Sequence, residues 1–156
     1  MEPTSDYLLN NWNDLTRDLP KLKNEFNQNL TSLYTSQSRF YHTLNHIEAL
    51  LKLSEEHQQL LGSSKTVDFA IWYHDAIYDA SKSNNEEKSA QLARKNLTEL
   101  GLVPDLIENC YNLIIATKTH QLTQDLDSFD AQFLLDIDLS ILASERGKYL
   151  EYTQEI

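Results

Sequence analysis

One stretch of this sequence places a histidine and an aspartate next to each other inside an apolar, aromatic run. The run is Phe69-Ala70-Ile71-Trp72-Tyr73-His74-Asp75-Ala76-Ile77-Tyr78-Asp79. An ionised carboxylate in apolar surroundings is costly unless a positive group pairs with it. Adjacent side chains on a helix point roughly 100° apart, so we expect His74 and Asp75 to pair directly only poorly. A divalent cation would satisfy both, because imidazole and carboxylate are ordinary ligands of transition metals.

Other histidines and aspartates have spacings that could complete such a site. His42 and His46 are four residues apart, so on a helix they share one face. His120 follows a predicted helix, and Asp136 and Asp138 interrupt an otherwise apolar run that ends at Leu142. Residues two apart on a helix are separated by about 200° of rotation, so only one of these aspartates can face the site.

Each of these residues also has a purely structural explanation. A single helical histidine is usually a surface or core residue, and His57, in Glu55-Glu56-His57-Gln58-Gln59, is assigned to that class. His120 could instead be a partner of the helix dipole at a C-terminus, and Asp136 or Asp138 could cap the last helix. We favour a metal site because the set as a whole has few structural explanations.

The elements expected to position these residues are all helices. The chain has only three glycines and three prolines, and long stretches carry apolar residues at helical spacing. Polar loops are expected over 79–85 and 120–127. The spacing predicts helices over 4–17, from Pro20 to about Leu33, over 39–61 and 65–78, from about Asn84 to Leu100, from Pro104 towards His120, and from about 128 to the end of the sequence. We therefore predict an all-α fold, with residues 1–156 forming one domain.

Composition excludes several classes of protein. Hydrophobic residues make up 40% and charged residues 24% of the 156 residues, as in a soluble globular domain. The net charge of −11 opposes binding to duplex nucleic acid. Cys110 is the only cysteine, so no internal disulfide is possible. The sequence has no apolar signal core near Met1 and no run of the ~20 apolar residues needed to span a bilayer, so we expect a cytoplasmic protein that does not bind membranes.

Taken together, the motifs resemble the HD-domain superfamily of metal-dependent phosphohydrolases, and most closely its small predicted members of unknown substrate. The resemblance covers about residues 39–142. It depends on Tyr41-His42, His46-Ile47, Trp72-Tyr73-His74-Asp75, Tyr78-Asp79, Asn85-Glu86, Ser89-Ala90, Ala116-Thr117-Lys118, His120 and Asp136-Ile137-Asp138-Leu139.

The resemblance implies an all-helical bundle that holds the metal between helices. It implies His46, His74, Asp75 and one late aspartate as ligands; Asp138 is our choice and Asp136 the alternative. Tyr41-His42 followed by His46 is also similar to the start of the cyclic-nucleotide phosphodiesterase site, where the first histidine donates a proton. Here Thr43 replaces the asparagine of those enzymes. Relatives continue beyond a stretch like Tyr149 to Tyr152, so we expect a shortened member or a fragment.

These observations predict a hydrolase acting on a phosphomonoester or phosphodiester, such as a nucleotide or another small phosphorylated metabolite. One divalent ion (Mn, Fe, Co, Ni, Zn or Mg) would activate water and polarise the phosphoryl group. His42 or His120 would deliver a proton, and Lys118 or Arg39 would hold the phosphate. Asp79 and Glu86 could hold a second ion, although loop and capping roles explain them better. The alternative is a non-catalytic module that binds a nucleotide or a protein, and whether the chain forms a homodimer stays open.

Overall fold

Helix α4 (Ser64–Tyr73) lies at the centre of the structure, a computed structural model that describes residues 5–19, 23–35, 43–121 and 128–154. The helix is apolar on nearly every side, which is typical of a helix buried within a larger protein. Its residues from Phe69 to Tyr73 are fully buried. Helices α1, α3, α5, α6 and α7 all contact it, so His74 follows directly on the most enclosed element of the fold.

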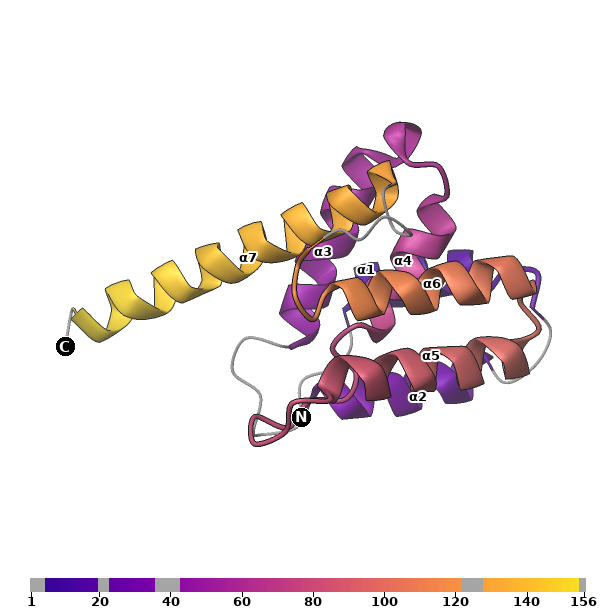
Figure 1. Cartoon of the computed structure of the whole chain (residues 1–156), viewed down its shortest axis with the longest axis horizontal. Coiled ribbons are helices and arrows are strands. Elements are labelled where there is room, and N and C mark those ends of the chain that lie inside the picture. The colour runs from indigo at the N-terminus through magenta and orange to yellow at the C-terminus, as the bar shows by residue number, and fades with distance from the viewer. Residues whose placement is uncertain (1–4, 20–22, 36–42, 122–127, 155–156) are drawn as a thin grey trace.

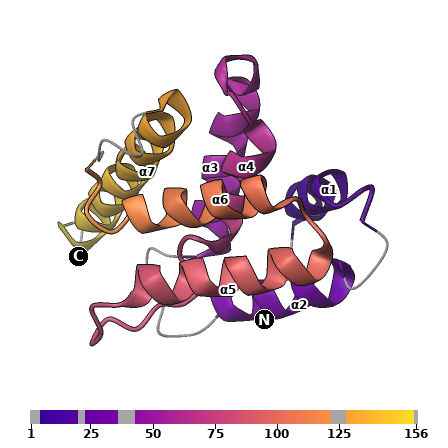
Figure 2. The same ribbon diagram turned by 45° about the vertical axis from the view of Figure 1, so that its right-hand side comes forward.

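Seven α-helices and no strand occur in the described part of the chain, which confirms the all-α prediction. Figures 1 and 2 show α5 and α6 lying side by side, while α7 extends well beyond the other helices towards the C-terminus. No helix among the described residues is long and apolar enough to cross a membrane. The remaining helices are α1 (Asp6–Leu15), α2 (Lys23–Tyr34), α3 (Leu44–Glu56), α5 (Asn85–Leu100), α6 (Pro104–Ala116) and α7 (Phe129–Gln154), with a short 3-10 turn at Gln58–Leu60.

Several helix ends form where local sequence signals place them. The Ser5 hydroxyl accepts a hydrogen bond from the Leu8 N–H and caps α1. Gly101 ends α5 with a φ of 91°, which glycine adopts without strain. Pro104 occupies the first turn of α6, where its missing N–H costs nothing.

Among the helices that are shorter than predicted, two carry residues of the candidate site. The helix expected over 39–61 begins at Leu44, because Thr43 has extended backbone angles, and its regular part ends at Glu56. His42, which was predicted to share a helix face with His46, lies outside the described residues. The helix expected over 65–78 ends at Tyr73, so His74 is its C-cap and Asp75 lies in the following turn.

The start of α7 is tied to the loop that precedes α4. The backbone N–H groups of Gly62 and Ser63 donate to the two carboxylate oxygens of Asp130, at 2.8 and 2.9 Å. Both donors belong to the non-helical segment at the start of α4, where N–H groups lack helical partners. This contact anchors the beginning of α7 beside α4, and two turns later the helix carries Asp138.

Candidate metal centre

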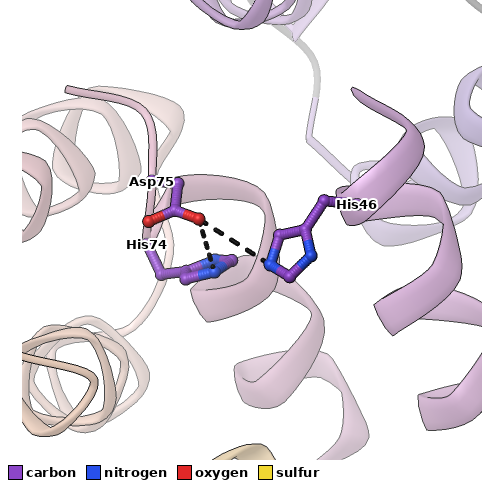
Figure 3. A group of neighbouring side chains, drawn as sticks. All are labelled: His46, His74 and Asp75. Atoms are coloured by element: carbon purple, nitrogen blue, oxygen red, sulfur yellow. Dashed lines mark ion pairs between the residues drawn. The ribbon is translucent and has the colours of Figure 1, made fainter. Parts of the chain in front are cut away.

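Three side chains from two helices converge at one buried point. Ligand atoms of His46, His74 and Asp75 all lie within 4.8 Å of one another. Figure 3 shows His46 reaching from α3 towards the His74-Asp75 turn, with the Asp75 carboxylate facing both imidazoles. The Asp75 Oδ2 atom lies 3.1 Å from Nε2 of His74 and 3.7 Å from Nε2 of His46. Both histidines are inaccessible to solvent, and Asp75 is partly exposed.

The close approach of His74 and Asp75 contradicts the expectation that they pair only poorly. That expectation assumed a continuous helix, in which neighbouring side chains diverge. The regular helix ends at Tyr73; His74 still has right-handed helical backbone angles, and Asp75 lies in the turn that follows, with its carboxylate 3.1 Å from the imidazole of His74.

Asp138 supplies a fourth group to this point from α7. Its Oδ1 atom lies 2.9 Å from Nε2 of His46 and 3.4 Å from Nε2 of His74. Asp138 is 3% exposed, whereas Asp136 is an exposed residue on the same helix. The two aspartates thus diverge as expected from their separation on a helix.

A hydrogen bond to the backbone determines which ring nitrogen of His74 carries the proton. Its Nδ1 atom lies 2.7 Å from the carbonyl oxygen of Ile71, and because a carbonyl only accepts, Nδ1 carries the proton. In the neutral imidazole, Nε2 then presents a lone pair to the carboxylates of Asp75 and Asp138. This buried atom makes no hydrogen bond. Such a contact between a lone pair and two carboxylates is repulsive unless a proton or a cation lies among them.

The distances among His46, His74 and Asp75 fit a single cation. Two ligand atoms that each lie about 2.0–2.2 Å from one ion are separated by roughly 3.0–3.5 Å. The nitrogen–oxygen separations here run from 2.9 to 3.7 Å. Two imidazoles and two carboxylates would also balance a 2+ ion in formal charge. The donor set suits a first-row transition metal.

In the absence of a cation, the residues of the cluster shift one another's pKa values. Burial alone would lower the pKa of His74, but the carboxylates of Asp75 and Asp138 hold that pKa well above its ordinary value. Burial would conversely raise the pKa of Asp138, yet His74 and hydrogen bonds from His120 and His46 hold it well below its usual range. Both shifts arise because His74 and the two carboxylates face one another in the buried site.

A tyrosine from α2 fixes the turn that carries His74 and Asp75. The Tyr34 hydroxyl donates to the carbonyl oxygen of Trp72 at 2.7 Å and accepts from the backbone N–H of Asp75 at 3.2 Å. Just beyond the turn, the Ser89 hydroxyl accepts from the N–H of Ile77 at 3.0 Å. Neither Tyr34 nor Ser89 was predicted as a support of this turn, because each reaches it from a different helix.

His120 also contacts the cluster, although through only one residue. Its Nε2 atom lies 2.7 Å from Oδ2 of Asp138, whereas His46 contacts the other oxygen of that carboxylate, Oδ1. The His120 side chain is 20% exposed, so it lies at the edge of the buried site.

The other candidate residues lie elsewhere or have other partners. Lys118 is exposed and forms an ion pair with Glu87 at 2.5 Å. Asp79 accepts hydrogen bonds from the N–H and hydroxyl of Ser81, as expected of a loop residue. His57 donates through Nδ1 to the carbonyl oxygen of Leu53, in keeping with a structural role. His42 and Arg39 lie outside the described residues.

Comparison with known proteins identifies no relative. No protein-family model, curated protein or solved structure matches this chain.

Proposed function

We propose that this protein is a divalent-metal-dependent phosphohydrolase of the HD type, with His46, His74, Asp75 and Asp138 as its metal ligands. The single observation that carries the proposal is the buried Nε2 of His74, which faces two carboxylates and makes no hydrogen bond. Its other ring nitrogen is committed to the Ile71 carbonyl, so the atom facing the carboxylates is available to a cation.

A bound divalent ion would supply a Lewis acid that polarises a phosphoryl oxygen and lowers the pKa of a water molecule. The surrounding protein determines how a substrate reaches that point. His46 and His74 close the inner side, since both are fully buried, whereas Asp75 and His120 are 15% and 20% exposed and lie on the open side. A phosphorylated substrate would therefore approach past these two residues.

Charge balance explains how an acidic protein could accept a phosphate. Without a cation, Asp75 and Asp138 would repel a phosphate anion in a chain whose net charge is −11. A divalent ion neutralises both carboxylates and removes that barrier. Lys118 would add a positive charge only by exchanging its partner Glu87 for the substrate, so we assign it no more than an auxiliary role.

The proposal is tested by elemental analysis of the purified protein, followed by a phosphate-release screen over phosphomonoesters, phosphodiesters and nucleotides with Mn²⁺, Co²⁺ or Zn²⁺ added. We expect about one metal ion per chain and turnover of at least one class of substrate. His74→Ala and Asp75→Ala should lose both, while His57→Ala retains both. Metal binding without turnover across the panel would favour the non-catalytic module, and wild-type protein that binds no metal would refute the site itself.

A further inference from the structure

The two carboxylate oxygens of Asp138 contact different histidines. Oδ1 faces the Nε2 atoms of His46 and His74, at 2.9 and 3.4 Å. Oδ2 faces Nε2 of His120 at 2.7 Å. Each oxygen thus has its own set of neighbours. The hydrogen bond to His120 limits rotation of the carboxylate about the Cβ–Cγ bond of Asp138.

The hydrogen bond between His120 and Asp138 has a defined direction. An ionised carboxylate only accepts, so the proton of this contact belongs to Nε2 of His120. A contact of 2.7 Å between nitrogen and an ionised oxygen is in the range of charge-assisted hydrogen bonds. The Nε2 proton is then committed to Asp138. This differs from the expected role of His120, in which that histidine delivers a proton to a leaving group.

The backbone of His120 adopts a conformation that histidine tolerates only at a cost. Its φ is 54°, and it is the only residue other than glycine with a positive φ in the described ranges. Its N–H donates to the carbonyl oxygen of Ala116 at 3.0 Å, which closes the turn after α6. Glycine is the usual residue at such a position because it has no Cβ. The chain therefore places an imidazole where the backbone alone would favour glycine.

We propose that His120 is a positioning residue for the metal centre: it holds Oδ2 of Asp138 so that Oδ1 is presented to the cation. The inference rests on the metal site proposed above. Residues that orient a ligand in this way typically change metal affinity by about 10–100-fold when they are removed. In this role His120 does not bind the metal itself, and it does not deliver a proton to a leaving group.

His120→Gly is the most informative variant, because glycine adopts a φ of 54° without strain and removes only the imidazole. His120→Gln is the conservative variant, since its terminal amide can donate to Asp138. Gln121→Ala, at the exposed neighbouring position, is the matched control. Circular dichroism of the metal-free proteins establishes that each variant is folded.

The measurement is the affinity for Co²⁺ by competition with a chromophoric chelator, together with the visible spectrum of the bound Co²⁺. We expect His120→Gly to bind Co²⁺ 10–100-fold more weakly with an altered spectrum. His120→Gln should recover most of the affinity, and Gln121→Ala should match the wild type. No enzymatic activity is needed for this readout.

Three outcomes would overturn the assignment. Wild-type affinity in His120→Gly would show that the hydrogen bond does not position the carboxylate. A loss in both His120→Gly and His120→Gln as complete as in His74→Ala would make His120 a ligand instead. Failure of the wild-type protein to bind Co²⁺ would refute the metal centre as well, and so separates the two proposals.

Discussion

Three of the four candidate ligands are oriented by a contact outside the shared point. His74 is held through its Nδ1 by the Ile71 carbonyl, and Asp138 through its Oδ2 by His120. Asp75 is held through its backbone N–H by Tyr34. Outer contacts of this kind set the tautomer and direction of ligands before a metal arrives.

Asp138 and Asp136 provide a direct test of the ligand set. Asp138→Ala should lower metal affinity by at least about 100-fold, because it removes one of the four ligands and leaves His46 and His74 facing a cavity. Asp136→Ala should stay within about twofold of the wild type, because its side chain is exposed on the opposite side of α7. Isothermal titration of both variants with Zn²⁺ decides it. A larger loss for Asp136→Ala would reverse the assignment.

Proton release provides a second test at the scale of single residues. The carboxylates of Asp75 and Asp138 hold the pKa of His74 well above its ordinary value of 6.5, which favours the protonated imidazole in the metal-free protein. A metal ion must displace that proton, because the same nitrogen cannot hold both. Metal affinity should therefore rise as the pH rises, and binding should release protons. Calorimetry in two buffers of different ionisation enthalpy measures the number, and a value of zero would contradict His74 as a ligand.

His74 and Asp138 should both make the stability of the metal-free protein depend on pH. A raised pKa in the folded state means that His74 stabilises the fold fully below the unfolded pKa, about 6.5, and that this contribution is lost as the pH rises through the folded value. Asp138 has a lowered pKa, so its contribution is present above the unfolded value of about 3.8 and is lost as the pH falls through the folded value. Unfolding of the metal-free protein in urea between pH 3 and 9 should show stability falling on both sides of a mildly acidic maximum.

At the scale of secondary structure, the geometry of the candidate site depends on where the helices end. The stripes of apolar residues predicted which segments are helical, and three of the helix ends coincide with residues that favour such ends, at Ser5, Gly101 and Pro104. The end of α4 at Tyr73 carries no such signal, since Ala76 and Ile77 continue the apolar pattern. The turn is held instead by Tyr34 and Ser89, which are 41 and 12 residues away from their partners. Sequence spacing therefore identified the candidate ligands, whereas the pairing of His74 with Asp75 depended on contacts between helices.

Tyr34→Phe tests the support of this turn. The substitution removes a buried hydroxyl that bonds to both Trp72 and Asp75, and should cost about 1–3 kcal/mol of stability. Metal affinity should fall as well, because the Asp75 backbone loses its anchor. Tyr73→Phe is the matched control, since its hydroxyl accepts a hydrogen bond from Asn96 rather than from the turn. Equal metal affinity in the two variants would show that Tyr34 contributes only to stability.

At the scale of the whole molecule, the candidate site joins α3 and α7 to the end of the central α4. His46 belongs to α3, His74 and Asp75 to the end of α4, and Asp138 to α7. A bound metal would therefore link segments that otherwise meet mainly through apolar packing and the Asp130 contact with Gly62 and Ser63. A ligand that binds only the folded state stabilises it by mass action.

Metal removal should consequently lower the melting temperature. At a free metal concentration 100 times the dissociation constant, the stabilisation is about 2.7 kcal/mol, which corresponds to roughly 5–10 °C for a chain of this size. Differential scanning fluorimetry with and without a chelator measures the shift. Asp75→Ala should show no shift, and an equal shift in that variant would place the metal elsewhere.

The pairing of His46 with Asp138 spans 92 residues, and this separation has a consequence for how the protein is made. Synthesis proceeds from the N-terminus at about 5–20 residues per second, so the candidate ligands His46, His74 and Asp75 leave the ribosome seconds before Asp138. An ion that meets the nascent chain early finds an incomplete set of donors and an unfilled space where α7 will pack. With the proposed set of ligands, stable metal binding would therefore require that α7 has been made and has docked, so a metal-bound protein would be one whose last helix is in place.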